Sequence, residues 1–310
     1  MATTLPVRDA TALASAALRH SGLSGVLADH VAEVLVAADM MGHRTHGLAL
    51  LPTYLEELAR GGMTISGDYR IERDVGAALF IDACRLPGAY VLRDILRKMV
   101  DRSAAHPVVT ASIGNCFHIG ALQTYLEIAT GAGLLCLLTA TDPAIASVAP
   151  FGGLDPVITS NPIAFGIPTS GDPILIDFCT SVISNAVVRT HLAAGQQLPG
   201  DWLIDGHGQP TRDPAAVTAS PPGTILPIGG TDFGYKGFAL GLMVEAMALA
   251  LSGYGRTGDH RLFGEGVFVQ VINPDYFSGT DFFKREMDGL AARSTGSRVP
   301  AGADRVRLPG

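Results

Sequence analysis

Residues 42–47 place two histidines, an arginine and a threonine between two glycines. The imidazole of His46 titrates near neutral pH, so this residue is the first candidate for proton transfer. The flanking glycines permit backbone bends that other residues resist. The alternative is a structural histidine whose hydrogen bonds are satisfied within the core. We interpret the segment as part of a site, because it lies between two apolar helical patterns.

A second histidine lies where a predicted strand ends and a predicted helix begins. His118 follows the strand at 108–113, and such junctions form the crevice in which α/β sheets bind ligands. The backbone amides that open the next helix could hold a phosphate. From the residues alone, a structural role for His118 is equally open.

Two further polar positions are candidates for ligand binding. Asp177 opens a second strand-to-helix junction, although Thr180 or Ser181 could serve there as an ordinary helix cap. Lys236 precedes a long apolar helix and could pair with a phosphate or a carboxylate. The alternative for Lys236 is a solvated charge at the start of that helix.

Helices and strands are predicted to alternate along most of the chain. Strands are predicted at 77–82, 108–113, 134–139, 163–168, 173–178 and 267–272. Helices are predicted at 8–40 with a break at 21–25, at 52–60, 88–105, 121–130, 182–194, 235–251 and 281–292. The alternation favours an α/β sheet, and the strands within 163–178 resemble a hairpin. Residues 195–232 are expected to be an extended loop, and 235–251 a buried helix too short to cross a bilayer.

Composition limits the class of protein. The 310 residues are 47% hydrophobic and 16% charged, which allows a large core and hints at surface hidden against a partner subunit. The net charge of -7 comes without a basic stripe, so nucleic acid binding is not expected. The four cysteines lack C-x-x-C spacing, and the first nine residues lack the apolar core of a signal peptide. We therefore expect a reduced cytoplasmic protein with no metal site and no membrane association.

Residues 253–258 match the pattern G-x-G-x-x-G of dinucleotide-binding loops. That pattern has meaning only after a strand and at the start of a helix. Here it follows a long apolar helix, and residues 259–261 do not open another one. We expect a glycine-rich loop that ends the helix, and no conventional Rossmann domain.

Several separated segments agree with one known family. They are 37–42 with 45–47, Pro52 with Tyr54, 114–120, 142–153, 160–165, 177–181, 234–237 and 307–310. On these segments the sequence resembles the type 2 malate/L-lactate dehydrogenase family. That family also includes ureidoglycolate dehydrogenase, diketogulonate reductase and the reductases of piperideine- and pyrroline-carboxylates.

The resemblance implies a non-Rossmann α/β fold with a mixed sheet, flanking helices and a helical N-terminal region. Residues 1–68 would form that region, packed with 276–310, and 69–275 would form the domain for cofactor binding and dimerisation. NADH or NADPH would be the cofactor and a small molecule the substrate. The protein would be a homodimer with its active sites in a cleft between domains.

The resemblance also implies roles for individual residues. Hydride would pass between nicotinamide and a C=O or C=N carbon next to a carboxylate, as in 2-keto acids, 2-hydroxy acids and cyclic imino acids. His46 matches the family's proton donor, Thr45 the residue that orients it, and His118 the proton acceptor of the ureidoglycolate branch. Which histidine transfers the proton is open, and we favour His46. The implied cofactor contacts are His118, Ile119, Gly120, Ala121, Leu122, Thr141, Asp177, Phe178, Cys179, Lys236, Pro309 and Gly310. The implied substrate contacts are His46, Arg44, Ser160, Asn185 and Ala186.

Two positions depart from the family's pattern. Leu50 stands where the family has an arginine that clamps the substrate carboxylate, and leucine cannot make a bidentate salt bridge. Arg44 is close in sequence but would have to point into the same cleft. Val187 stands where relatives have a lysine or an aspartate. These changes predict an atypical substrate. The alternative is a non-catalytic or repurposed member of the family, a binding protein or an enzyme of another class.

Overall fold

The computed structural model describes residues 5–258 and 262–310. Its main element is a seven-stranded sheet in the order β1-β2-β3-β10-β4-β5-β6. The strands are β1 (Arg70–Asp74), β2 (Ala78–Asp82), β3 (Val108–Cys116), β4 (Leu135–Thr141), β5 (Pro162–Ile167), β6 (Ile174–Cys179) and β10 (Glu265–Ile272). Only β2 and β3 pair in parallel, and the other neighbours are antiparallel. The predicted mixed α/β sheet and the β5–β6 hairpin are confirmed.

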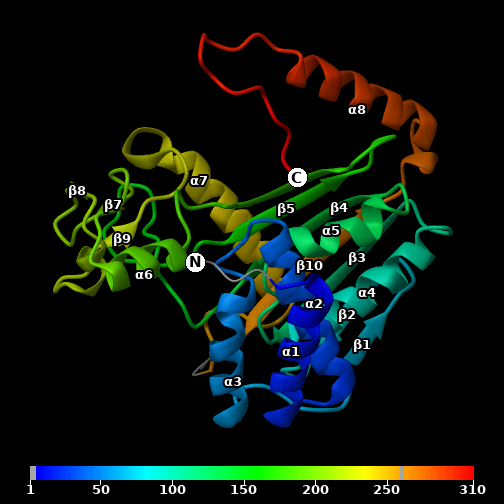
Figure 1. Ribbon diagram of the computed structural model, residues 1–310, viewed down its shortest axis with the longest axis horizontal. Coiled ribbons are helices and arrows are strands. Elements are labelled where there is room, and N and C mark those ends of the chain that lie inside the picture. Colours follow the sequence, from blue (N-terminus) through cyan, green and yellow to red (C-terminus); the bar gives the residue numbers. More distant parts are fainter. Residues whose placement is uncertain (1–4, 259–261) are drawn as a thin grey trace.

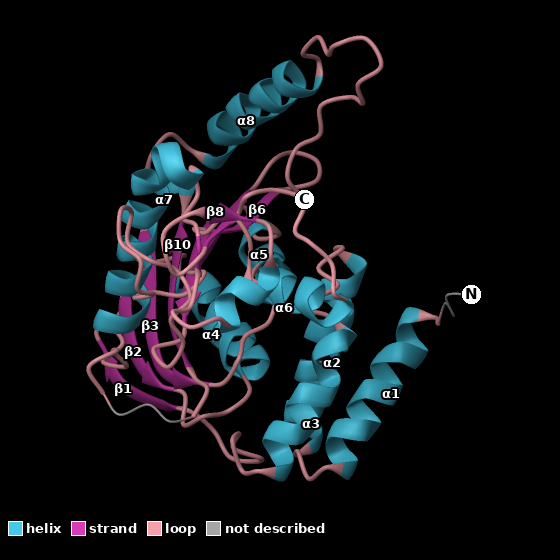
Figure 2. Cartoon of the chain, turned by 90° about the vertical axis from the view of Figure 1, so that its left-hand side faces the viewer, coloured by secondary structure: helices cyan, strands magenta, loops and turns pink. Residues whose placement is uncertain are grey.

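Helices cover both faces of this sheet (Figure 2). Helices α4 (Gly88–Arg102) and α5 (Gln123–Thr130) pack on one face, and α7 (Gly230–Val244) lies on the other. The central strand β10 is buried on both sides, and its Val267, Val269 and Val271 are fully buried in the largest hydrophobic cluster. Such a continuous apolar strand suits a position between two layers of helices.

The N-terminal region consists of α1 (Val7–His20), α2 (Gly25–Met40), the 3-10 turn η1 (Leu48–Leu50) and α3 (Leu51–Ala59). The predicted break between the first two helices is real, and Gly22 adopts a φ of 98° there. Buried leucines of α1 and α2 belong to the same hydrophobic cluster as the sheet. The apolar face of α2 thereby fixes the segment that follows it, 41–47, against the body of the protein.

The region 195–232, expected to be an extended loop, contains a small sheet in the order β8-β7-β9. Its strands β7 (Leu203–Ile204), β8 (Pro210–Thr211) and β9 (Thr224–Ile225) are too short to show alternation in the sequence. With the 3-10 helix η2 (Pro214–Thr218) and α6 (Asn185–Ala194), they enclose a separate hydrophobic cluster. The expectation was therefore wrong in part, because a local apolar core orders this region.

Helix α7 begins at Gly230 and continues into the π-helical segment η3 (Glu245–Ala250). We expected a buried helix, but only one face of it is buried. Val244 is fully buried against the sheet, whereas half of Leu242 is exposed. We expected a helix too short to cross a bilayer, but α7 and η3 together run over 21 residues and are long and apolar enough to do so. Core helices of soluble proteins can have the same length and composition. Residues 253–258 form turns after it, as predicted, and 259–261 lie outside the described residues.

The C-terminal part consists of the 3-10 turn η4 (Pro274–Tyr276), helix α8 (Thr280–Thr295) and an irregular tail. Figure 1 and Figure 2 place α8 at the end of the molecule opposite α1 and α3. The tail returns to the edge of the sheet, where the Leu175 amide donates to the Pro309 carbonyl at 3.0 Å. The packing of 276–310 with 1–68 and the domain boundary at residue 68 stay predictions.

Candidate active site

A cavity of 300 Å³ opens between the N-terminal helices, the main sheet and α6. It brings together most of the residues that the sequence predicted for a site. Those that line it are Thr45, His46, His118, Gly120, Ala121, Leu122, Thr141, Ser160, Asp177, Phe178, Cys179, Asn185 and Ala186. Segments that are far apart in the sequence thus meet at one place.

The segment that carries His46 is fixed by a contact that requires glycine at position 47. A Cβ atom at Gly47 would lie 2.0 Å from Oδ1 of Asp39, at the end of α2. The absence of a side chain lets Oδ2 of Asp39 accept a hydrogen bond from the Leu48 amide at 2.9 Å. Within the segment, Oγ1 of Thr45 and Nδ1 of His46 share a hydrogen bond of 3.0 Å. The Nε2 atom of His46 is not used by that bond.

His118 is held from two sides. The Tyr54 hydroxyl shares a hydrogen bond of 2.8 Å with its Nδ1, and Oε1 of Glu265 lies 3.9 Å from its Nε2. The other carboxylate oxygen of Glu265 accepts a bond from the Ile119 amide at 3.0 Å. The rings of His46 and His118 lie nearly parallel, with centroids 6.0 Å apart. Two imidazoles therefore face one small cavity.

Burial controls the protonation of these groups. It lowers the pKa of His46 to about 4, with His43 and Arg189 adding to the effect. It lowers the pKa of His118 to about 3, with His46 and Arg189 contributing. It raises the pKa of Glu265 to about 8. At neutral pH both rings are therefore neutral bases, and Glu265 is largely a neutral acid.

Asp177 links the sheet to the start of α5. Its Oδ2 accepts a hydrogen bond from the Gln123 amide at 2.9 Å, and burial raises the pKa of this carboxyl group. The Gln123 side chain in turn accepts a bond from Nε2 of His43 at 2.7 Å. This chain of contacts ties 41–47 to the end of β6, so the N-terminal region and the sheet line the cavity together.

The lining residues fit the nicotinamide end of a dinucleotide. Gly120 adopts a φ of 80°, which leaves the backbone after His118 without a side chain at the cavity wall. Phe178, at the end of β6, keeps 39% of its surface exposed beside this backbone and could pack against a planar ring. Ser160 and Thr141 add hydroxyl groups.

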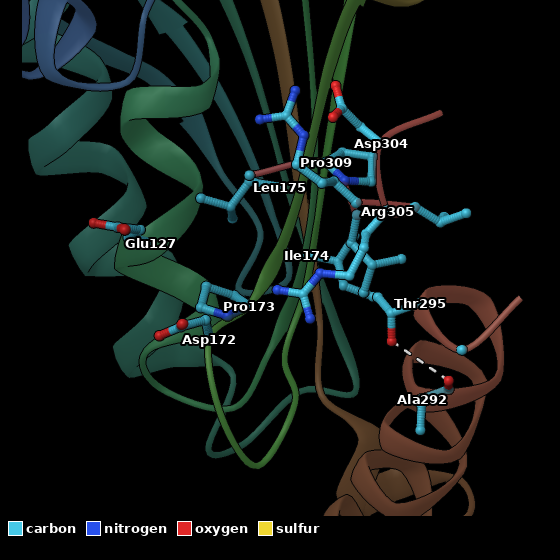
Figure 3. A pocket seen from close by; sticks show the side chains of 15 residues that line it. Glu127, Asp172, Pro173, Ile174, Leu175, Ala292, Thr295, Asp304, Arg305 and Pro309 are labelled. Atoms are coloured by element: carbon cyan, nitrogen blue, oxygen red, sulfur yellow. Dashed lines mark hydrogen bonds between the residues drawn. The ribbon is translucent and has the colours of Figure 1, made fainter. Parts of the chain in front are cut away.

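The structure places five predicted site residues elsewhere. Arg44 is exposed and outside the cavity lining, and Ile119 is buried behind it. Lys236 lies on α7, with Nζ 5.1 Å from the centre of the Phe233 ring. Pro309 and Gly310 line a separate, open hollow between the tail, α8 and β6 (Figure 3). Their predicted roles as ligand contacts stay predictions.

Six polar lining residues were not predicted as site residues, namely His43, Asp142, Thr159, Ser184, Arg189 and Glu265. Arg189 lies one helical turn after Ala186, and this i, i+3 spacing was the available signal. Glu265 gave no signal, because it precedes an apolar strand like any residue at a strand start. His43 was visible in the 42–47 segment but was not distinguished from Arg44.

The two unusual positions face away from the cavity. The side chain of Leu50 packs against the main hydrophobic cluster, and that of Val187 packs against the cluster around the small sheet. Neither residue lines the cavity. Their apolar side chains therefore contribute to the core, and the polar groups of the cavity come from other positions.

A pair of partly buried imidazoles that share one cavity at the edge of a mixed α/β sheet is typical of an enzyme with an acid–base site. Residues 5–310 match the family model described as malate/L-lactate dehydrogenase, so the chain belongs to this family of oxidoreductases that use a nicotinamide cofactor. It is 30% identical to L-lactate dehydrogenase from Cupriavidus necator over 92% of this chain and 82% of that protein. It is also 30% identical to Delta(1)-pyrroline-2-carboxylate reductase 1 from Burkholderia ambifaria, over 98% and 88% of the two chains.

A solved structure shows the same fold. Delta1-piperideine-2-carboxylate reductase from Pseudomonas syringae superposes with a TM-score of 0.87 at 28% identity, covering 100% of this chain and 91% of that one. The expected resemblance, the fold class and the assignment as an enzyme are thus confirmed.

Proposed function

We propose that this protein transfers hydride between NADH or NADPH and a C=O or C=N carbon next to a carboxylate. The substrate would be a 2-keto or 2-hydroxy acid or a cyclic imino acid, with His46 as the proton donor and acceptor. The observation that supports this most is the convergence of His46 and His118 on one cavity. Relatives named for lactate and for a cyclic imino acid support both kinds of substrate.

In reduction the bound cofactor would supply the hydride and the protein the proton, and in oxidation the cofactor would accept the hydride and the protein the proton. When the Thr45 hydroxyl accepts from Nδ1–H of His46, Nε2 keeps a lone pair that can take a proton from a substrate hydroxyl. With a pKa near 4, His46 is in this basic form at neutral pH, ready for oxidation of a hydroxy acid. Reduction requires His46 to take up a proton before or during substrate binding.

His118 is assigned a supporting role. Its Nδ1 is engaged by Tyr54, and its pKa is lowered further than that of His46. It therefore suits the binding of a substrate or cofactor oxygen better than the gain of a proton. Gly120, Ala121 and Leu122 would contact the cofactor beside it.

The test is cofactor binding followed by turnover. NADH or NADPH fluorescence should change on titration with the protein, and a panel of keto acids and cyclic imines should be reduced. His46→Ala should lower kcat by roughly 100- to 10,000-fold while cofactor affinity is kept. The control is His207→Ala, because His207 is an exposed loop residue outside the cavity lining. Binding of neither cofactor would exclude the proposal.

A second candidate function is a non-catalytic or repurposed member of the family. The apolar residues Leu50 and Val187 favour it, because they replace groups that relatives keep polar. In that case the protein would bind a nicotinamide cofactor or a carboxylate without turnover. Reduction of any substrate of the panel, lost in His46→Ala, would exclude this alternative.

We also propose that the protein is a cytoplasmic homodimer. Helix α7 presents an exposed apolar stripe that includes Tyr235, Leu242 and Met243, and α8 has no buried residue in the described chain. A second subunit would cover these surfaces. The mass in solution from light scattering should be twice 32.3 kDa, and Leu242→Glu should shift it toward the monomer. A monomeric wild-type protein would contradict the proposal.

A further inference from the structure

We propose that Arg189 binds the carboxylate of the substrate, and that the cavity selects substrates with a single carboxylate. This inference rests on the proposed function and specifies its substrate class. It also explains how a site can bind an anionic substrate although Leu50 packs into the core. The carboxylate-binding group has moved from the segment after His46 to helix α6.

The geometry of α6 turns Arg189 toward the cavity. Asn185, Ala186 and Arg189 line it, and Arg189 follows the other two at the i+4 and i+3 spacing of one helix face. Val187 is two positions before Arg189, a rotation of roughly 200°, so it points to the opposite side. There it packs against the small hydrophobic cluster with Val188. A polar residue at 187 could not reach the cavity from this helix orientation.

Helix α6 is tied to the cavity at its first turn. The Asn185 side chain donates to Oγ1 of Thr159 at 2.9 Å, and Ser184 caps the helix. The positive end of the helix therefore faces the same space as the Arg189 guanidinium, and both favour an anion there. Within the described residues, Arg189 has no hydrogen bond or ion pair that would occupy its guanidinium.

The remaining charges explain the preference for one carboxylate. Arg189 is the single arginine or lysine among the cavity-lining residues of the described chain. Three carboxyl groups line the rest of the cavity, from Asp142, Asp177 and Glu265. A second carboxylate on the substrate would therefore approach acids and would meet no second permanent cation among the residues that the structure describes. The charges of the cavity fit 2-oxo acids and cyclic imines that carry one carboxylate, and they do not fit dicarboxylates.

Arg189 also links substrate charge to proton transfer. Burial lowers the pKa of His46 most, and the positive charges of His43 and then Arg189 add to this effect. The other titratable groups that share the cavity with His46 are His43, His118, Asp142, Asp177, Cys179 and Glu265. An anion bound to Arg189 offsets its charge and raises the pKa of His46. Substrate binding thus promotes the proton uptake that reduction requires.

The test uses three unreactive probes on the full-length protein loaded with NADH or NADPH. Oxamate carries one carboxylate beside an oxo group. N-propyl oxamate adds an uncharged tail, and N-oxalylglycine adds a tail of similar length that ends in a second carboxylate. Binding is followed by nicotinamide fluorescence for the wild type, Arg189→Met, Arg189→Lys and the control Arg73→Met. Arg73 is an exposed arginine on β1 outside the cavity lining, so its replacement removes the same charge away from the site.

Arg189→Met should weaken oxamate binding roughly 10- to 100-fold, Arg189→Lys should lie between it and the wild type, and Arg73→Met should bind like the wild type. Wild-type protein should bind N-propyl oxamate at least about tenfold more tightly than N-oxalylglycine. In hydroxy acid oxidation, Arg189→Met should also move the acid limb of kcat/KM to higher pH, a change that a merely structural role would not cause.

The outcomes separate this inference from the proposed function. If no variant binds either cofactor, the proposed function fails and the inference fails with it. If cofactor binds but the oxamate affinity is equal in wild type and Arg189→Met, or absent in both, Arg189 is not the carboxylate site and the proposed function stands. If N-oxalylglycine binds as tightly as N-propyl oxamate, the selection for one carboxylate is wrong.

Discussion

The imidazole rings of His46 and His118 lie 6.0 Å apart at an interplanar angle of 22°, although one follows helix α2 and the other follows strand β3. Each ring has its own hydrogen-bond partner at Nδ1, Thr45 for the first and Tyr54 for the second. The two rings therefore share the cavity without sharing a proton. This arrangement agrees with the proposed roles, in which His46 transfers the proton and His118 positions a ligand.

The Tyr54 hydroxyl orients His118, and its removal is the first prediction. Tyr54→Phe leaves Nδ1 of the buried ring without its 2.8 Å partner. The free energy of unfolding should fall by about 1 to 3 kcal/mol, because a buried polar group loses its hydrogen bond. Activity should fall mainly through KM. Urea unfolding and steady-state kinetics measure the two effects. Tyr235→Phe is the control, since Tyr235 is half exposed. Equal behaviour of the two variants would show that the bond does not orient His118.

The lowered pKa values of the two histidines predict acid lability. In the unfolded chain each histidine takes up a proton near pH 6.5, whereas in the folded protein His46 does so near pH 4 and His118 near pH 3. Below pH 6.5 the unfolded state therefore binds more protons, and stability falls as the pH falls toward these values. Urea unfolding at pH 7 and pH 5 should show this loss. In His118→Asn the free energy of unfolding should fall less between pH 7 and pH 5. An unchanged fall would mean that His118 titrates normally.

The raised pKa of Glu265 predicts the opposite dependence of the free energy of unfolding on pH. Its pKa is about 8 in the folded protein against 4.5 for an unperturbed glutamate side chain, so the folded state binds more protons between these values. The stability contributed by the neutral acid is complete below pH 4.5 and is lost as the pH rises through 8. Glu265→Gln keeps an acceptor for the Ile119 amide and cannot ionise. The variant should lose less stability than the wild type between pH 6 and pH 9, and an identical loss in both proteins would contradict the assignment.

The sequence could predict the parts of the site that come from continuous local patterns. His46 and His118 stand out because each lies beside a glycine-rich bend at the end of a predicted element. The α/β sheet followed from the alternation of predicted strands and helices, whereas its mixed pairing came only from the family resemblance. The small sheet β8-β7-β9 could not be predicted, because two-residue strands carry no periodicity and are ordered by tertiary contacts.

Helix orientation limited the prediction of the substrate contacts. The sequence showed that Leu50 and Val187 differ from the expected polar residues, but not which way they point. In the structure both pack into hydrophobic clusters, and Arg189 lines the cavity instead. The rotation of α6 about its axis is fixed by the burial of Val188 in a cluster whose other members are far from it in the sequence, such as Val148 and Ile225. This constraint comes from tertiary packing, which a local pattern does not contain.

Gly47 provides the last prediction, because it links backbone geometry to the position of His46. A Cβ atom at this position would lie 2.0 Å from Oδ1 and 2.3 Å from Cγ of Asp39, so the carboxylate would have to move. Its bond to the Leu48 amide would then break, and the segment that carries His46 would shift. Gly47→Ala should lower kcat at least about tenfold, since small displacements of a catalytic group are costly. It should also lower the free energy of unfolding by about 1 to 3 kcal/mol.

The control is Gly171→Ala, because a Cβ atom there meets nothing within 4 Å. Steady-state kinetics measure kcat and urea unfolding measures the free energy of unfolding for both variants. A kcat of Gly47→Ala equal to that of the wild type would show that the Asp39 contact does not position His46.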